Sequence, residues 1–272
     1  MTHKQTFLSP NRLSTAARAP EATYLWDLLR EMVGRELKLR YKRSLLGLAW
    51  SLLNPLAQLL VFSLVFRYIL PLNIPNYPAF LFTGLLAWVW FQTGLLNATG
   101  AIVNNPELIK RPGFPVAILP IVTVTTQLVH YLLALPVLLT FLWFTDLMPG
   151  WWLLLLPPLL LLQFIFTLGL AYLAATIHVL FRDTEHLLTI ALFLLFYLSP
   201  VFYDVGLLPD HVARIYALNP LVHLLDAHRA LLLTHTWPDW PPLLLLALLS
   251  GLLLLVGYRL FKATSHRFVE EL

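Results

Sequence analysis

Long apolar runs that contain no Asp, Glu, Lys or Arg divide the chain into blocks. They cover residues 44–66, 68–106, 112–145, 147–181, 187–203 and 240–258. A membrane-spanning helix needs about 20 mostly apolar residues, because it rises about 1.5 Å per residue through a hydrocarbon core about 30 Å thick. Open strands are excluded, since lipid would leave their backbone groups unpaired. The pattern predicts an all-α polytopic membrane protein with six transmembrane helices within 44–258; the run 187–203, with 17 residues, is the shortest.

The segment before the first apolar run has a different pattern. Five apolar residues recur there at helical spacing: Leu25, Leu28, Leu29, Met32 and Val33. Glu31–Arg35 and Glu36–Arg40 are four residues apart with the acid first, which supports a helix. We predict an amphipathic helix over 23–43 in the inner membrane interface, either as an anchor or as a mechanical element joined to the first span. Residues 1–22 are expected to form a flexible cytoplasmic tail and 259–272 a cytoplasmic C-terminal tail.

The basic residues predict the orientation. With a cytoplasmic N-terminus, fifteen Lys and Arg residues lie in inner segments, and Arg67, Arg214 and Arg229 lie outside. This excess follows the positive-inside rule. Both termini are therefore expected to be cytoplasmic, and no secretory signal is recognisable in the first 44 residues.

Small residues also recur four apart within the predicted spans, and such pairs permit close helix packing. They are Gly47–Ser51, Gly94–Ala98, Ala171–Ala175 and Ala247–Gly251.

Composition agrees with the apolar runs. The 272 residues are 59% hydrophobic and 12% charged, whereas soluble domains carry about 25% charged residues. The chain has no cysteine, which excludes disulfides, a thiolate nucleophile and cysteine metal sites. The net charge of +4 is explained by topology and anionic lipid, so no nucleic-acid partner is expected.

Catalytic and ion-carrying patterns are missing from the sequence. His130 and His178, inside predicted spans, have no acidic residue three or four positions away and are interpreted as packed histidines rather than proton carriers. The phosphate-binding motif of ATPases is absent. The nearest approach to a metal cluster is His223, Asp226 and His228, but His228 is about 140° from His223 on a helix. We expect no metal site and no enzyme.

Five segments together carry a family resemblance. They are Tyr41–Pro55 (YKRSLLGLAWSLLNP), Phe181–Asp183 (FRD), Ser199–Tyr203 (SPVFY), Leu218–Leu221 (LNPL) and Gly257–Phe261 (GYRLF). In this order, over roughly residues 24–268, the chain resembles the membrane subunit of type-two ABC exporters for polysaccharides. The resemblance implies export of lipid-linked O-antigen, capsular polysaccharide or teichoic acid across the bacterial cytoplasmic membrane. It also implies a homodimer with two separate ATPase subunits, which would carry ATP and Mg while this chain carries no cofactor.

The same resemblance implies where the ATPase subunits dock. The segment 104–114 corresponds to a coupling helix between spans two and three, and its prolines bracket the charges of Glu107, Lys110 and Arg111. A charged turn that only fixes topology is the alternative. A second inner contact is implied between spans four and five. The implied coupling residues are Asn105, Pro106, Glu107, Leu108, Ile109, Lys110, Arg111, Arg182, Asp183 and Glu185.

The outer segment 204–239 resembles the family's paired short helices, which re-enter the membrane and gate the exit. Its stretch 221–233 is too apolar for a free loop, and Asp226 and Arg229 are three residues apart. It is too short and too charged for a seventh span.

Aromatic residues are the candidates for the sugar path, because their rings can guide the apolar C–H faces of sugars without gripping them. Trp88, Trp90 and Phe91 lie near the middle of the second predicted span, a depth unusual for an interfacial belt. Trp88, Phe91 and Gln92 share a helical face. Phe196, Tyr197, Phe202 and Tyr203 are further candidates. The alternative is that these rings only pack against neighbouring helices.

Two other functions remain open from the sequence. One is a type-two ABC permease for a drug or a lipid. The other is a polytopic membrane enzyme that modifies glycans, such as a lipid-linked sugar transferase. An enzyme would need outer-face acids, but Asp146, Asp204, Asp210, Asp226 and Asp239 are scattered.

Overall fold

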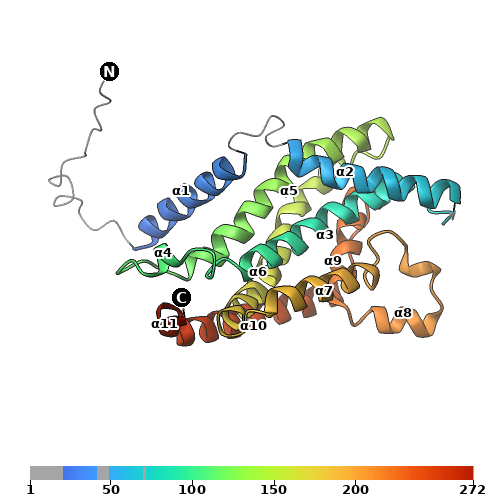
Figure 1. The fold of residues 1–272 in the computed structure, drawn as a ribbon. Helices are drawn as coiled ribbons and strands as arrows, with labels where there is room; N and C mark the ends of the chain where they lie inside the picture. Colours follow the sequence, from blue (N-terminus) through green and yellow to red (C-terminus); the bar gives the residue numbers. More distant parts are fainter. Residues whose placement is uncertain (1–20, 42–48, 70–71, 272) are drawn as a thin grey trace, which may run out of the picture.

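The computed structural model describes residues 21–41, 49–69 and 72–271, and this part of the chain is helical with no strand (Figure 1). The predicted all-α class is confirmed. The predicted tail 1–22 falls almost entirely outside the described residues, as do residues 42–48 with much of the segment that begins at Tyr41.

The elements follow one another with short connections. The longer helices are α1 (Glu21–Tyr41), α2 (Ala49–Leu64), α3 (Tyr77–Thr99), α5 (Ile118–Phe144), α6 (Leu156–Leu180), α7 (Thr184–Tyr197) and α10 (Trp240–Thr264). The short helices are α4 (Pro106–Ile109), α8 (Asp210–Tyr216), α9 (Pro220–Arg229) and α11 (Phe268–Glu271). Single turns of other helix types are η2 (Val65–Ile69), η3 (Gly150–Leu155), η4 (Val205–Leu207), η5 (Ala230–Thr234) and η6 (Ser265–Arg267).

Four described helical segments are long and apolar enough to cross a membrane. They are Tyr77–Thr99, Ile118–Phe144, Gly150–Leu180 and Trp240–Arg267. Two further apolar helices, Leu53–Leu64 and Thr184–Tyr197, are shorter. The chain is therefore a multi-pass membrane protein, and the count of six spans stays a prediction.

Helix α3 lies in the middle of the bundle. It packs against α5 on one side and α6 on another, with α2 and α9 also against it. Its interior-facing residues Leu81, Leu85 and Ala98 have almost no exposed surface. A helix that is apolar all round can face lipid or other helices, and the neighbours of α3 enclose it on most sides. The longest helix–helix contact joins α6 and α10.

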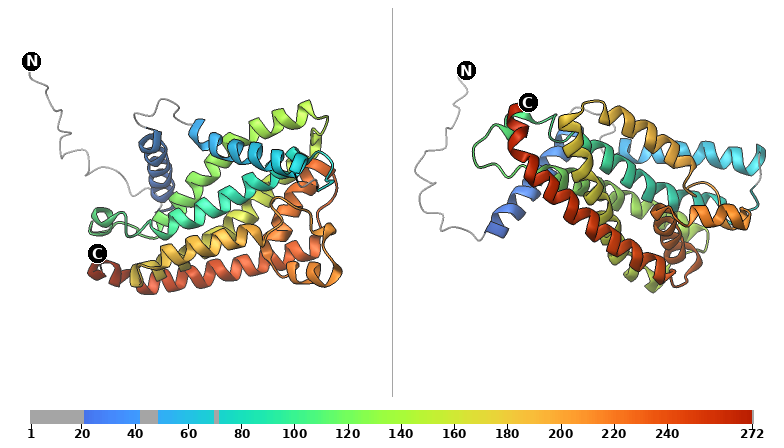
Figure 2. Two further views of the ribbon diagram at one scale, coloured as in Figure 1. Left: turned by 45° about the vertical axis from the view of Figure 1, so that its right-hand side comes forward. Right: turned by 90° about the horizontal axis from the view of Figure 1, so that it is seen from below.

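Helix α1 lies across the outside of the bundle, as Figures 1 and 2 show. It contacts α5, where Val33 packs with Ile118 and Val122. The Oγ1 atom of Thr126 on α5 lies 3.1 Å from Oε2 of Glu36 on α1. Helix α1 covers most of 23–43, whereas its amphipathic role in the membrane interface stays a prediction.

The described C-terminal residues pack at one end of the bundle. Helix α10 continues to Thr264, beyond the predicted end of the last span at 258. The following α11 contacts α4 and α6, and Phe268 is fully buried with its ring 5.1 Å from that of Phe261. Residues 259–271, expected as a tail, are therefore helical, because Phe268 buries its ring on the end of α10.

Candidate functional site

The predicted coupling residues lie at one end of the bundle, beside α11 and the C-terminus (Figure 1). The side chain of Asn105 donates to the carbonyl oxygen of Ala101, and Pro106 begins α4, where no amide donor is needed. Ile109 is 4% exposed and anchors the helix, while Glu107 and Lys110 are exposed. The buried Ile109 therefore holds α4 against the bundle, while the charged side chains of Glu107 and Lys110 remain exposed.

The second predicted coupling segment is the turn between α6 and α7. Arg182 and Asp183 are exposed, and Arg182 Nη2 donates to the backbone oxygen of Glu271 in α11 at 3.3 Å. Glu185 Oε2 lies 3.5 Å from Nε2 of His178. Sequence reasoning missed this pair, because the two residues are seven apart and a turn brings them together.

Residues of both coupling segments line one cavity of about 330 Å³. Glu185 lines it from the start of α7, Asn105 and Leu108 from the α4 segment, and Arg35 and Glu36 from α1. The structure therefore brings α1 to the same place as both predicted coupling segments. Side chains of α1, the α4 segment and α7 thus face one another across this cavity.

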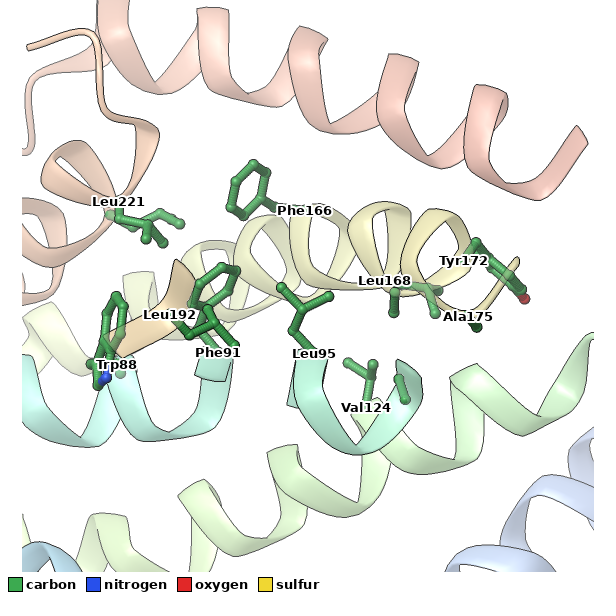
Figure 3. Close-up of a cluster of buried hydrophobic side chains, with 14 of the residues drawn as sticks. Trp88, Phe91, Leu95, Val124, Phe166, Leu168, Tyr172, Ala175, Leu192 and Leu221 are labelled. Atoms are coloured by element: carbon green, nitrogen blue, oxygen red, sulfur yellow. The ribbon is translucent and has the colours of Figure 1, made fainter. Parts of the chain in front are cut away.

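Trp88 and Phe91 of α3 are both 2% exposed and belong to the buried cluster that α3 forms with α6 and α7 (Figure 3). The indole Nε1 of Trp88 donates to Oε1 of Gln92 at 2.9 Å, as expected for residues on one helical face. Phe91 stacks on Phe166 of α6 with ring centroids 5.8 Å apart. Within a single chain these two rings are packed, which was the alternative to a path-lining role.

Trp90 lies on a different face of α3. Its ring is 5.4 Å from that of Tyr131 on α5, and it packs with Leu86 and Leu138 in a separate cluster. Residues two apart on a helix are about 200° apart around its axis. The structure therefore separates Trp90 from Trp88 and Phe91.

The remaining predicted path residues are neighbours at the end of α7. The ring of Phe196 is 5.6 Å from Trp88 and 5.6 Å from Phe202. Tyr197 and Tyr203 flank Phe202 at 5.9 and 4.9 Å. The rings thus continue from the interior of α3 to the turn after α7.

Two residues that sequence reasoning missed complete this row. Phe62 of α2 and Phe66 of η2 each stack on Phe202 with centroids 5.5 Å apart. Phe62 and Phe66 are four apart, so they share a helical face, but no sequence pattern indicates which helix that face meets. We call this continuous row the aromatic file; its members are Phe62, Phe66, Trp88, Phe91, Phe196, Tyr197, Phe202 and Tyr203.

The aromatic file runs from the buried Trp88 and Phe91 to the edge of the chain, where α2 and α7 are exposed. On α7, Ile190 is 58% exposed and Tyr197 48%; on α2, Leu60 is 62% exposed. The file contains no charged side chain. Aromatic rings of this kind offer apolar faces, and the tyrosines add a polar tip, so the row suits a neutral ligand with alternating apolar and hydroxyl surfaces.

The described residues contain no group of three or more His, Cys, Asp or Glu side chains that could hold a metal ion. His223 and His228 instead contact backbone oxygens, those of Ala217 and Leu224, both at 2.8 Å.

The chain is similar in sequence to known proteins over most of its length. The family model described as ABC-2 type transporter matches residues 27–233. The chain is 38% identical over 247 residues to the O-antigen export system permease protein RfbA of Myxococcus xanthus, covering 90% of this chain and 95% of that protein. It is 32% identical to the protein of the same name from Klebsiella pneumoniae, covering 92% and 96%. It is 24% identical to the polysialic acid transport protein KpsM of Escherichia coli, covering 87% and 93%.

Proposed function

This chain belongs to the ABC-2 type transporter family, and we propose that it is the permease subunit of an ATP-driven exporter of lipid-linked O-antigen polysaccharide. The observation that carries the proposal is identity of 32–38% over at least 90% of the chain with permeases named for O-antigen export. The more distant relative named for polysialic acid transport makes capsular polysaccharide the second candidate, ahead of teichoic acid.

The proposed setting is the bacterial cytoplasmic membrane, with six spans and both termini cytoplasmic. Besides the four long helices, α2 with η2 forms a continuous helical stretch of 21 residues, Ala49–Ile69, enough for about 30 Å. Helix α7 has 14 residues and reaches about 21 Å, so the turn at 199–203 would complete this span. The excess of basic residues at the α4 end supports a cytoplasmic position for that end.

The proposed engine is a separate ATP-binding subunit, present in two copies, that holds ATP and Mg. The sequence has no phosphate-binding loop, which supports ATP binding by a separate subunit. Helix α4 and the α6–α7 turn would dock on that subunit. Their charged side chains are exposed, while neighbouring residues such as Ile109 are buried and hold the backbone in place. Closure of the ATP-binding subunits would then displace α4, and the movement would reach the α6–α7 turn through α11, which contacts α4 and accepts a hydrogen bond from Arg182.

The proposed path lies between two copies of this chain. The aromatic file follows α2 and α7, which, like α10, expose apolar side chains in the single chain. A second copy facing these helices would enclose the file from both sides. Stacked rings without charge could then guide a hydroxyl-rich polymer through weak, repeated contacts.

The test is reconstitution of export. The chain and its ATP-binding subunit, produced in a strain that lacks its own O-antigen exporter, should restore polysaccharide on the cell surface in an ATP-dependent way. Small-molecule stimulation of ATPase activity without any effect on surface glycan would favour a drug or lipid permease. Glycan modification that needs an outer-face acid and no ATP-binding subunit would favour a membrane enzyme.

A further inference from the structure

Arg229, the last residue of α9, is a buried cation. The residue is 6% exposed, although it belongs to the polar outer segment of the chain. Burying a charged side chain is costly unless its charge and its donors are compensated. Its contacts therefore indicate which segments it holds together.

The strongest contacts of Arg229 are with the turn that follows α7. Its Nη2 atom donates to the backbone oxygens of Pro200 at 2.6 Å and Val201 at 2.9 Å. Helix α7 ends at Tyr197, so these carbonyls lie in the turn beyond it. Hydrogen bonds from an ionised donor are about twice as strong as neutral ones.

Helix α3 forms the other side of the arginine site. The guanidinium carbon lies 3.6 Å from the ring centroid of Phe80, a cation–π contact. A Cβ atom placed on Gly84 would be 2.6 Å from Arg229 Nη2 and 3.1 Å from the Val201 oxygen. Only a glycine at 84 leaves room for the guanidinium between α3 and the turn.

The counter-charge comes from the same helix. Asp226 Oδ1 lies 3.5 Å from Arg229 Nη1, and the Asp226 side chain is 53% exposed. The ion pair therefore balances the charge without tying α9 to another element. The carbonyl and ring contacts, by contrast, join α9 to the turn and to α3.

The turn held by Arg229 also carries the outer end of the aromatic file. Phe202 follows Val201 directly, and its backbone oxygen accepts a hydrogen bond from Tyr77 of α3 at 3.0 Å. We propose that Arg229 is a positioning residue for export: it joins α9, the turn at 199–203 and α3 into one unit and so fixes the position of Phe202 and Tyr203. This inference rests on the proposed function, because the file is an exit only in a permease.

The test uses the natural absence of cysteine. Val201 is fully buried, so a single Val201→Cys substitution gives a reporter that a membrane-impermeant maleimide, added to cells with the complete transporter, should not reach. Arg229→Met should raise labelling about tenfold, the size expected from losing hydrogen bonds of a charged donor. Arg229→Lys should give an intermediate value, because an ammonium lacks the planar fork that serves two carbonyls.

A second substitution, at Gly84 of α3, disturbs the contact between Arg229 and the turn at 199–203. Gly84→Ala should raise Val201→Cys labelling and lower surface polysaccharide, because the added methyl displaces the guanidinium. Gly251→Ala is the matched control, since nothing lies within 4 Å of a Cβ there. Leu142→Cys, a buried reporter near the outer end of α5, should stay unlabelled in both variants if the change is local.

The outcomes separate this inference from the proposed function. Unchanged labelling of Val201→Cys in both Arg229→Met and Gly84→Ala overturns the inference, as does increased labelling with undiminished export. If Arg229→Met fails to accumulate, labelling of Val201→Cys in Gly84→Ala alone tests the inference, and unchanged labelling there overturns it. Increased labelling in a chain whose unsubstituted form exports no polysaccharide would support the joining role but refute the proposed function.

Discussion

Gly257 of α10 lies directly against Gly169 of α6. A Cβ atom on Gly257 would be 2.6 Å from the Gly169 backbone oxygen, and one on Gly169 would be 2.7 Å from the Leu254 amide nitrogen. The two backbones are therefore in contact along the longest helix pair of the bundle. Small residues allow this approach, which favours helix association in lipid.

Substitution of Gly257 by alanine is expected to destabilise the bundle. The methyl group would meet a backbone oxygen that can move only with its helix, a change that costs about 1–3 kcal/mol. We expect Gly257→Ala to lower the unfolding temperature of the purified protein in detergent. Gly251→Ala, on the same helix but in open space, should not change it; equal unfolding temperatures for the two variants would refute the α6–α10 contact.

Charge reversal on α4 is expected to stop export without affecting insertion. Lys110→Glu together with Arg111→Glu removes exposed positive charge from the proposed docking surface, and we expect at least about a tenfold loss of surface polysaccharide. The measurement compares export, protein level and co-purification with the ATP-binding subunit. Lys262→Glu, an exposed charge on α10, serves as the control. Normal export by the α4 variant would exclude this surface as the coupling site.

The structure changes how the aromatic path is best tested. Trp88→Ala would leave a large cavity and cost about 3–5 kcal/mol, so lost export would also reflect lost folding. Tyr197 belongs to the same file but is 48% exposed. We expect Tyr197→Ala to reduce surface polysaccharide several-fold while the unfolding temperature stays nearly constant. Phe144→Ala, an aromatic 75% exposed at the end of α5, should leave both unchanged; equal export by the two variants would count against the file.

The helices could be predicted from the sequence because lipid imposes one strong rule: charge-free runs must pair their backbone internally. The run 187–203 shows the limit of this rule. It counts apolar residues after Tyr197, but Pro200 cannot continue a helix, and Asn219 donates to the Ser199 hydroxyl at 3.0 Å to fix a turn instead. The stretch 221–233, too apolar for a free loop, begins within α9 (Pro220–Arg229), and its re-entry into the membrane stays a prediction.

Partner choice between helices could not be predicted. The small pair Ala247–Gly251 fits the spacing rule, yet Gly251 faces open space, while Gly169 and Gly257, 88 positions apart, make the contact. Likewise Asp226 and Arg229 form the ion pair that their spacing suggests, at 3.5 Å, but nothing in the sequence indicates that Arg229 turns inward to Gly84. Such pairs depend on how whole helices meet, which local periodicity does not encode.

The candidate site residues likewise include some that the sequence alone could identify and some that required the fold. The chemistry of Glu107 and Lys110 was readable from prolines and charge, and their exposure agrees with a docking role. Trp90 could have been separated from Trp88 by helical geometry alone, whereas the stacking of Phe62 on Phe202 required the fold.

The central claim is that this chain forms half of a conduit driven by a separate ATP-binding subunit. The most direct measurement places the purified chain in lipid vesicles with lipid-linked O-antigen and follows its translocation with and without that subunit and ATP. The account predicts translocation only when the subunit and hydrolysable ATP are both present. Full-rate translocation by the chain alone would contradict it.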